Sequence, residues 1–383
     1  MKKRKNAKMQ NLVAGIFLVL LAIFFLGNLL KPTKGYSEQE NRSLAGRPQL
    51  TWTSVVSGMF AEQYEKYQSD QLIGRNLWRD LAVNLRILTG SNKENGIFYG
   101  RQNQLLEEIR KPDEESFQAN LEAIQDFAGR HKELPMSILI VPDAAGAFPE
   151  RLPAFAETEN QMMILKRIQR ELEETVTWID VSEVFAEHAE EKLYYQTDSH
   201  WTSLGAYYGF QASGEALGIE QENMTNFVPY PVTAQFNGTL SARSGYAKDI
   251  QEEITIYIPG GKDIEVVVNY VDKQEKRTSI YQSDALEGRD KYQVFLGGND
   301  SLVDIRTTSD SDRRLLIFKD SSANCFVQFL IPYFREIVLV DPRYYAGDIE
   351  ELLDMYHVTD GLFLYRGNIF SRDNQLSGVL TSE

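Results

Sequence analysis

Two separate stretches of the sequence hold the residue types of a nucleophilic triad. Residues 194–202 read YYQTDSHWT, so Asp198 stands two positions before His200. Ser321 follows an apolar run, residues 315–318, within the sequence KDSS. A serine hydroxyl is a weak nucleophile that needs a base to take its proton and a carboxylate to orient that base. The combination predicts a serine-dependent hydrolase or acyltransferase.

Each member of this triad has an alternative. Ser322 is a rival nucleophile, and Asp320 could orient the base in place of Asp198. The loop that holds Asp198 precedes a predicted helix, and the start of a helix offers free backbone N–H groups that acidic side chains often cap. Asp198 could therefore be a cap only. His200 could be a buried, hydrogen-bonded histidine beside an aromatic residue.

A glycine pair in a later stretch could stabilise the negative charge that forms during acyl transfer. A predicted short strand within residues 290–296 leads into Gly297, Gly298 and Asn299. This sequence puts bare backbone and a side-chain amide on one tight loop. Both can direct N–H donors to one point, as an oxyanion hole requires. An ordinary β-turn is the alternative.

Apolar patterns in the middle of the chain predict an α/β fold with parallel strands. Residues 113–131 and 160–174 have helical spacing, while residues 137–141 and 176–181 are apolar runs typical of strands. Alternating helices and strands indicate a parallel sheet. Ligands bind at the carboxyl ends of such strands. Asp143 follows one such end and is a candidate pocket residue, although Asp also favours turns and helix caps.

Later patterns complete this sheet and place Ser321 on a sharp turn. Residues 314–318 form a predicted strand and residues 324–330 a predicted helix. Strand, serine turn and helix follow one another as in a nucleophile elbow, although the G-x-S-x-G sequence is absent. The start of a helix behind Ser321 would also stabilise an oxyanion. Two further predicted strands are residues 336–340 and 361–365.

Residues 233–289 change character and are interpreted as a β-rich insertion between the two parts of the α/β core. Residues 254–258 and 264–270 are rich in β-branched and apolar side chains, and Pro-Gly-Gly joins them. This turn chemistry predicts a hairpin. An insertion at this place would cover or shape a cleft.

The N-terminus predicts a membrane anchor. Residues 1–9 are basic, and residues 12–30 are uncharged and apolar except for Asn28. About 20 apolar residues allow a helix to cross the hydrocarbon core. The positive flank places the N-terminus in the cytoplasm and the bulk of the chain outside. A cleaved signal peptide is the alternative, but it would have a shorter apolar region and small residues at its cleavage site.

A linker and a helical segment follow the anchor. Residues 32–48 are polar and contain Pro and Gly, and residues 60–88 have helical spacing that Gly74 interrupts. The segment 37–44, with the sequence SEQENRSL, carries no chemistry that its residue types predict.

Composition limits the possible functions. The chain has 383 residues, 43% of them hydrophobic, which is enough for one large domain with smaller additions. Its net charge of −15 argues against a nucleic-acid partner, because phosphate binding needs basic patches. No cluster of His, Cys and acidic residues has metal-ligand spacing, so neither a metal nor another cofactor is expected. The single cysteine, Cys325, excludes an intrachain disulfide.

Taken together, these stretches resemble the bacterial DHHW protein family. The motif that names the family appears here as residues 198–201 (DSHW), with serine in place of the first histidine. This departure leaves the proposed carboxylate and base in place. The resemblance extends over nearly the whole chain after the apolar segment. Further matching stretches are residues 37–44, 70–75, 295–299, 319–324 and 341–345.

The family is similar to the alginate O-acetylation proteins, which have SGNH-hydrolase-like domains with a permuted order of motifs. Here D-x-H precedes Gly-Gly-Asn and Asp-Ser, as in those relatives. The resemblance implies a three-layer α/β/α fold with a mostly parallel sheet. It implies Ser321 as nucleophile, His200 as base and Asp198 as its partner. It also implies that Asn299 and the backbone of Gly298 and Ser321 are oxyanion donors.

Arg343, beyond the predicted strand 336–340, joins the candidate substrate-binding residues. Five segments of the chain are expected on this basis. The segments are a basic tail and transmembrane anchor (1–31), a linker with a helical extension (32–110), the first part of the SGNH-like domain (111–232), the β-rich insertion (233–289) and the second part of the domain (290–383).

These features favour a membrane-anchored, extracellular O-acetyltransferase or acetylesterase that acts on cell-surface polysaccharide through an ester on the serine. By analogy with alginate acetylation, a membrane acyltransferase partner could supply the acyl group. The alternative is a non-catalytic carbohydrate-binding or exopolysaccharide-assembly protein of the same fold, because fold alone does not give function. A hydrolase for a lipid ester or a phosphoester is a further alternative.

Overall fold

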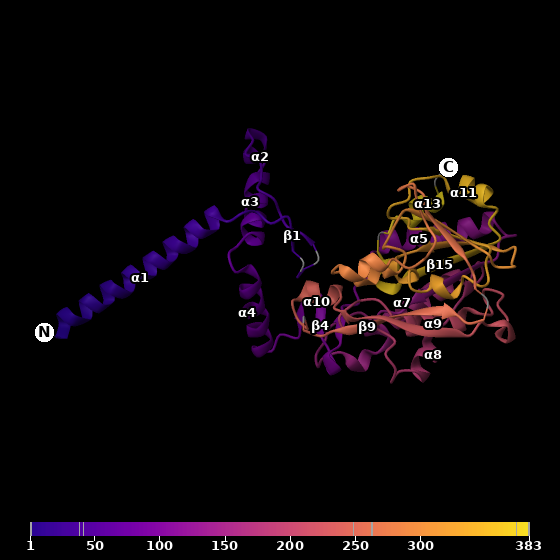
Figure 1. Ribbon diagram of the computed structural model, residues 1–383, viewed down its shortest axis with the longest axis horizontal. Helices are drawn as coiled ribbons and strands as arrows, with labels where there is room; N and C mark the ends of the chain where they lie inside the picture. Colours follow the sequence, from indigo (N-terminus) through magenta and orange to yellow (C-terminus); the bar gives the residue numbers. More distant parts are fainter. Residues whose placement is uncertain are drawn as a thin grey trace. The chain divides into compact units, whose positions relative to one another are not determined.

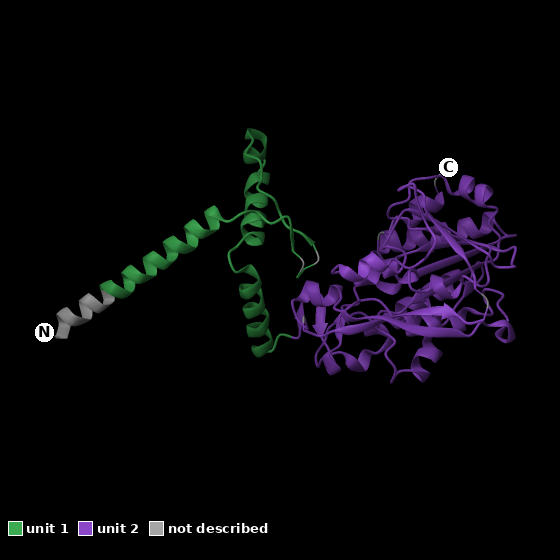
Figure 2. Cartoon of the chain, viewed as in Figure 1, with its two compact units in different colours: residues 1–91 green, residues 92–383 purple. Residues whose placement is uncertain are grey.

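The computed structural model describes residues 2–37, 39–40, 42–247, 249–261, 263–372 and 374–381, with the backbone alone for residues 2–10. The chain divides into two compact units, residues 1–91 and 92–383 (Figure 2). Glu38 and Asn41, which belong to the matching stretch 37–44, lie outside the described residues, as do the side chains of the basic N-terminal segment.

The first unit consists mainly of helices (Figure 1). The predicted helical segment 60–88 is confirmed, and it is interrupted at Gly74, whose φ of 67° is left-handed and suits glycine. The elements of this unit are α1 (Lys2–Leu30), β1 (Tyr36–Ser37), β2 (Arg42–Ser43), α2 (Trp52–Val56), α3 (Met59–Asp70) and α4 (Arg75–Leu88).

An ion-pair network explains the segment 37–44, for which the sequence suggested no chemistry. Arg42 donates two hydrogen bonds to Asp70, at 3.0 and 2.5 Å, in a fork that matches the carboxylate. Glu40 accepts from Arg42 at 2.7 Å and pairs with Arg75 at the start of α4. The side chains of Glu40 and Asp70 are nearly buried. The segment therefore connects the loop after α1 to α3 and α4 of this unit.

The second unit is built on an eight-stranded sheet in which four of the strand pairs are parallel. The predicted α/β class with a mainly parallel sheet is confirmed. The strands in spatial order are β11 (Glu275–Arg277), β10 (Val266–Tyr270), β12 (Leu302–Thr307), β14 (Glu336–Val340), β13 (Arg314–Lys319), β15 (Asp360–Arg366), β6 (Met136–Val141) and β7 (Thr177–Trp178).

Alternating side chains of the sheet feed two hydrophobic cores, one on each face. In β13, Leu316 and Phe318 belong to one core, while Leu315 and Ile317 belong to the other. The first core contains side chains from α5 (Glu114–Arg130), α7 (Gln161–Leu172), α11 (Ile349–Tyr356) and α13 (Leu376–Thr381). The second contains side chains from α8 (Ser182–Glu187) and α9 (Ser203–Ser213). Helices thus cover both faces.

The segment predicted as a β-rich hairpin is organised differently. Residues 254–258 and 264–270 do not pair with each other, so the predicted hairpin is wrong. Strand β9 (Glu252–Pro259) pairs with β8 (Phe227–Phe236), whereas β10 joins the large sheet beside β12. The reason is that β10 buries Val268 and Tyr270 in a core, which outweighs the local turn preference.

Two local predictions around the site are also wrong. The segment 324–330 is no α-helix, because the chain after β13 forms two short 3₁₀ turns, η6 (Ser321–Ala323) and η7 (Val327–Phe329). The segment 290–296 contains a 3₁₀ turn, η5 (Lys291–Val294), in place of a strand. The smaller elements are β3 (Lys93–Glu94), β4 (Ile97–Tyr99), β5 (Leu105–Glu107), α6 (Ala144–Ala147), α10 (Thr239–Ser244) and α12 (Gly367–Phe370).

A pair of glycine substitutions tests the packing of α9, the helix that follows the His200 loop. A Cβ atom at Gly205 would lie 2.4 Å from the carbonyl oxygen of Leu193, so we expect Gly205→Ala to lower the free energy of unfolding by about 1–3 kcal/mol. Gly129 lies near the end of α5, and a Cβ atom added there would meet no atom within 4 Å. Gly129→Ala should therefore raise the free energy of unfolding by about 0.5–1 kcal/mol. Urea denaturation of the full chain measures both; equal effects would contradict this packing.

Candidate active site

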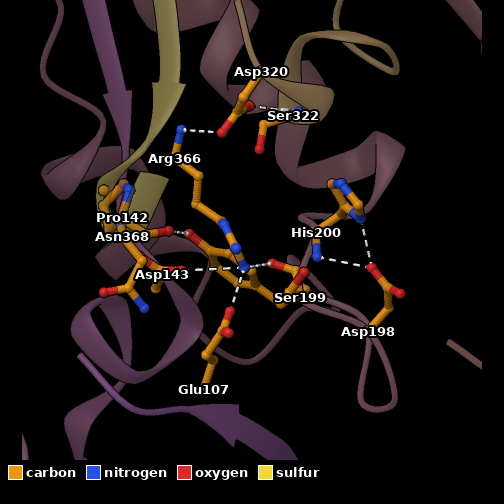
Figure 3. Close-up of polar contacts among 12 residues, drawn as sticks. Glu107, Pro142, Asp143, Asp198, Ser199, His200, Asp320, Ser322, Arg366 and Asn368 are labelled. Atoms are coloured by element: carbon orange, nitrogen blue, oxygen red, sulfur yellow. Dashed lines mark hydrogen bonds and ion pairs between the residues drawn. The ribbon is translucent and has the colours of Figure 1, made fainter. Parts of the chain in front are cut away.

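A chain of two hydrogen bonds joins Ser321, His200 and Asp198. Nε2 of His200 lies 2.8 Å from Oγ of Ser321, and Nδ1 of the same ring lies 2.6 Å from Oδ1 of Asp198. Ser321 is the first residue of η6, two positions after the end of β13, and is partly exposed. The orientation of His200 toward Asp198 is visible in Figure 3. The arrangement has the geometry of a nucleophile, a base and an orienting carboxylate.

The loop that carries His200 is closed at its base and attached to the serine turn. Tyr194 and Trp201 form an antiparallel bridge that closes the loop. The indole N–H of Trp201 donates to the carbonyl oxygen of Ser322 at 2.8 Å, so the two turns are linked directly. The ring of His200 stacks on Tyr292, with the ring centres 3.9 Å apart. These contacts fix the position of the imidazole relative to Ser321.

Asp198 is almost completely buried and fully hydrogen-bonded. Oδ2 accepts from the backbone N–H of Thr239 at 2.7 Å and from its hydroxyl at 2.9 Å, while Oδ1 accepts from the backbone N–H of His200 at 3.0 Å. Burial alone would raise the pKa of Asp198, but its interaction with His200 and these hydrogen bonds outweigh burial and hold the pKa well below its usual range. The carboxylate therefore stays ionised and can stabilise a protonated imidazole.

The segment 227–259 supports the His200 loop from one side. The buried carboxylate of Glu252, on β9, accepts hydrogen bonds from the backbone N–H groups of Gln196 and Thr197, each at 2.8 Å. Thr239, which binds Asp198, is the first residue of α10. Neither Thr239 nor Glu252 has a sequence signal that would have identified it, because both act through long-range contacts.

The rival residues on the serine turn have other partners. Asp320 accepts from the backbone N–H of Ser322 at 2.7 Å and from that of Arg366 at 3.0 Å, so its carboxylate holds the turn together. Ser322 is 1% exposed, whereas Ser321 faces His200. On geometric grounds, Ser321 and Asp198 are better placed for the chemistry than Ser322 and Asp320.

The Gly-Gly-Asn loop has a constrained backbone. Leu296, Gly297 and Gly298 have φ values of 60°, 71° and 102°, a left-handed run that glycine tolerates and leucine does not favour. The N–H of Gly298 lies 3.4 Å from the carbonyl oxygen of Phe295, and its carbonyl oxygen accepts from Asn324 at 3.0 Å. The backbone that precedes Asn299 is therefore tied to Phe295 and to Asn324.

A buried lysine orients the side chain of Asn299. Nζ of Lys319 donates to Oδ1 of Asn299 at 3.1 Å and to Oδ1 of Asn324 at 2.7 Å. Because the carbonyl oxygen of Asn299 is bound in this way, its NH₂ group remains as a donor for another acceptor. Lys319 is 1% exposed, and this burial lowers its pKa to about 8. Lys319 and Asn324 lie in the motif around Ser321, but nothing in the sequence indicates their contacts with Asn299.

Asp143 lies in a buried polar network around Arg366. Its carboxylate accepts from the side chain of Gln161 at 2.6 Å. The same carboxylate accepts from the backbone N–H of Asn368 at 2.8 Å, and Arg366 lies 3.3 Å from its other oxygen (Figure 3). Asp143 is 2% exposed. The structure thus places Asp143 beneath the site rather than on an open surface.

Arg366 connects this network to both turns of the site. Its guanidinium group pairs with Glu107 at 2.9 Å and donates to the carbonyl oxygen of Ser199 at 3.4 Å, between the two residues of the D-x-H motif. Its backbone N–H donates to the carboxylate of Asp320, the residue before Ser321. Arg366 was not identified from the sequence, and its only signal is its place directly after the predicted strand 361–365.

Arg343 forms a close pair with Asp341 just beyond β14. The guanidinium group donates to the two carboxylate oxygens at 2.8 and 2.6 Å, and Asp341 is completely buried. The Arg343 side chain is 28% exposed. Part of the positively charged guanidinium group is therefore accessible to solvent, while Nε and one terminal nitrogen bind Asp341.

Comparison with known families shows what class of protein this is. Residues 140–340 match the family model described as DHHW protein, so the chain belongs to the DHHW protein family. This confirms the resemblance found in the sequence. No curated protein sequence matches the chain.

The first two of the following solved structures share the fold. A DHHW family protein from Eubacterium siraeum is 24% identical, with a TM-score of 0.63, over 76% of this chain and 98% of that one. PatB1 from Bacillus cereus, solved with a sulfonyl adduct, is 20% identical, with a TM-score of 0.58, over 73% and 98%. The O-acetyltransferase domain of Pseudomonas putida AlgJ is 16% identical, with a TM-score of 0.49, over 74% and 95%.

The buried Lys319 leads to a prediction for stability. Its pKa is about 8 in the folded protein and near the ordinary 10.5 in the unfolded chain. Between these two pH values the unfolded state binds more protons than the folded state does. The free energy of unfolding therefore increases with pH in this range. We expect the stability of the wild type relative to Lys319→Met to increase by about 1–3 kcal/mol between about pH 7 and about pH 10.

Denaturant unfolding at a series of pH values measures this difference. The exposed Lys132→Met serves as the matched control and should follow the wild type at every pH. Parallel stability profiles for the wild type and Lys319→Met would show that the ammonium group of Lys319 is not affected by burial.

Proposed function

We propose that this protein is a serine O-acetyltransferase or acetylesterase that acts on cell-surface polysaccharide. The observation that carries the proposal is the hydrogen-bonded series from Ser321 through His200 to Asp198, with donor–acceptor distances of 2.8 and 2.6 Å. The acetyl and polysaccharide parts rest on the resemblance of the sequence to the alginate O-acetylation proteins. Transfer and hydrolysis differ in the group that accepts the acetyl, which depends on how well the occupied site excludes water.

In the first half of the reaction, Oγ of Ser321 attacks the carbonyl carbon of the acetyl donor while Nε2 of His200 takes its proton. Asp198 stabilises the imidazolium that forms. The tetrahedral intermediate collapses, and the departing oxygen of the donor receives the proton from His200. Acetyl-Ser321 remains. In the second half, His200 deprotonates a sugar hydroxyl or a water molecule, which attacks the acetyl carbon. The bond between Oγ of Ser321 and the acetyl carbon then breaks, and His200 returns the proton to Oγ.

Two donors are available for the oxyanion of these intermediates. One is the NH₂ group of Asn299, oriented by Lys319. The other is the backbone N–H of Ser321, for which the described residues provide no hydrogen-bond acceptor. Donors fixed before the reaction stabilise the developing charge without reorganisation. Gly298 contributes through the shape of the loop in this mechanism, because its N–H faces the carbonyl oxygen of Phe295 at 3.4 Å.

Arg343 and Asp143 are proposed to have different roles in substrate binding. Arg343 offers a partly exposed guanidinium group for a polar or acidic part of the substrate. Asp143 acts indirectly, because it neutralises Arg366 under the site.

The catalytic unit is further proposed to be an SGNH-hydrolase-like three-layer domain with permuted motif order. The order supports this: the D-x-H motif, Gly-Gly-Asn and Asp-Ser follow one another along the chain. In this division the domain comprises residues 111–232 and 290–383, and residues 233–289 are an insertion. Residues 1–31 are the anchor, and residues 32–110 are the linker and extension.

The protein is proposed to be anchored in the cell membrane by one helix, with the catalytic unit outside the cell. Among the described residues, one helix is long and apolar enough to cross a membrane, and its apolar segment is Asn11–Leu30. A basic N-terminal flank supports a cytoplasmic N-terminus. A membrane acyltransferase would be a suitable partner, because an extracellular enzyme needs a source of activated acetyl groups.

The proposal is tested by mass spectrometry of the full chain in detergent after exposure to p-nitrophenyl acetate. PatB1, of the same fold, has been solved with a sulfonyl adduct, which supports the use of a reactive probe. We expect one acetyl group on the peptide that contains Ser321. Ser321→Ala should abolish the adduct, whereas Ser322→Ala should retain it. Asp198→Asn should slow acylation by about 10²- to 10⁴-fold, because the base loses its orienting charge.

The outcomes separate the two candidate functions. An adduct on Ser322 would contradict the assignment of the nucleophile. A folded wild-type protein that gains no adduct and cleaves no ester, and that binds polysaccharide as well as Ser321→Ala does, would instead indicate the carbohydrate-binding or assembly function.

A further inference from the structure

Helix α4 exposes a continuous apolar face. Its large apolar side chains recur at helical spacing, so they lie along one side of the helix. All of them are exposed to a large extent: Leu77 (69%), Trp78 (50%), Leu81 (47%), Leu85 (53%) and Leu88 (82%). A contiguous apolar surface of this kind normally marks a place where another apolar surface binds.

The opposite face of α4 is charged, and it is the face that packs inward. Arg75 binds the nearly buried carboxylate of Glu40 at 2.9 Å, and Arg79 lies 3.4 Å from the same group. Val83, on this side, is 5% exposed. A helix of a soluble domain normally buries its apolar side and exposes its charges. In α4 the charged side faces inward and the apolar side faces outward. The ion pairs of Arg75 and Arg79 with Glu40 hold the helix in this orientation.

The start of α4 is tied to the end of the apolar segment of α1. The side chain of Asn28 accepts from the backbone N–H of Ile73 at 2.8 Å. The ammonium group of Lys31 lies 3.3 and 3.4 Å from the carbonyl oxygens of Gln71 and Leu72. These contacts, all within the first unit, place the turn before α4 beside the C-terminal end of α1.

We propose that α4 lies in the membrane–water interface with its apolar face in the lipid. This inference rests on the proposal that α1 spans the membrane, and it names the bilayer surface as the partner of α4. The argument for lipid is continuity: the helix begins where the apolar segment of α1 ends. Helices with a leucine face and an aromatic residue such as Trp78 lie in this region of a bilayer, with their charged side toward water.

Spin labels on single cysteines test the inference in the full chain. Cys325 is completely buried and should take no label in the folded protein. Labels are placed at Leu81→Cys on the apolar face, at Asn76→Cys on the exposed part of the other side as the matched control, and at Leu20→Cys in α1. The protein is inserted into vesicles of phosphatidylcholine and phosphatidylglycerol. Power saturation then measures collisions with oxygen, which concentrates in lipid, and with a water-soluble nickel chelate.

We expect the ratio of oxygen to nickel collisions at Leu81→Cys to be several-fold higher than at Asn76→Cys and close to that at Leu20→Cys. Frequent nickel collisions at Leu81→Cys would overturn the inference, because the face would then lie in water. Protection of Leu81→Cys from both reagents would also overturn it, since the face would then pack against protein. If Leu20→Cys itself has no lipid signature, the proposed span has failed and the interface position fails with it. None of these results depends on acetyl chemistry.

Discussion

The hydrogen bond between buried Asp198 and His200 is the interaction on which the rest of the site depends. A carboxylate without partners in this position would be strongly destabilising, because burial disfavours its charged form. Thr239 and the backbone N–H of His200 donate further hydrogen bonds to the carboxylate oxygens and keep the group ionised. The ionised carboxylate in turn fixes the imidazole ring, so that Nε2 meets the Ser321 hydroxyl.

A second constraint is that His200 and Ser321 come from turns far apart in the chain. Trp201 and Arg366 connect these turns below the site, the first through Ser322 and the second through Ser199 and Asp320. The guanidinium group of Arg366 is itself buried and is neutralised by Glu107 and Asp143. Preorganisation of this kind matters because a shift of about 1 Å between reacting groups can cost roughly 100-fold in rate.

The sequence was sufficient for the α/β class with a mainly parallel sheet, and it singled out Ser321, His200 and Asp198, which the structure joins by hydrogen bonds. Strongly periodic segments such as α5 and β13 follow local patterns, and the spacing within Asp198-Ser199-His200 brings two of the groups together. Elements governed by distant contacts were not predictable. Strand β10 joins the large sheet because of its buried side chains, and the contact between Lys319 and Asn299 joins residues that no local rule connects. The inverted polarity of α4 likewise emerges only once Glu40 is seen to bind its charged face.

The central claim is that Ser321 is an activated nucleophile facing a preformed oxyanion site. A crystal structure of the protein after reaction with an arylsulfonyl fluoride tests it most directly. The account predicts density continuous with Oγ of Ser321, with one sulfonyl oxygen within hydrogen-bonding distance of the Asn299 NH₂ group and the Ser321 backbone N–H. Unmodified Ser321 in a folded crystal, or an adduct on Ser322, would contradict it.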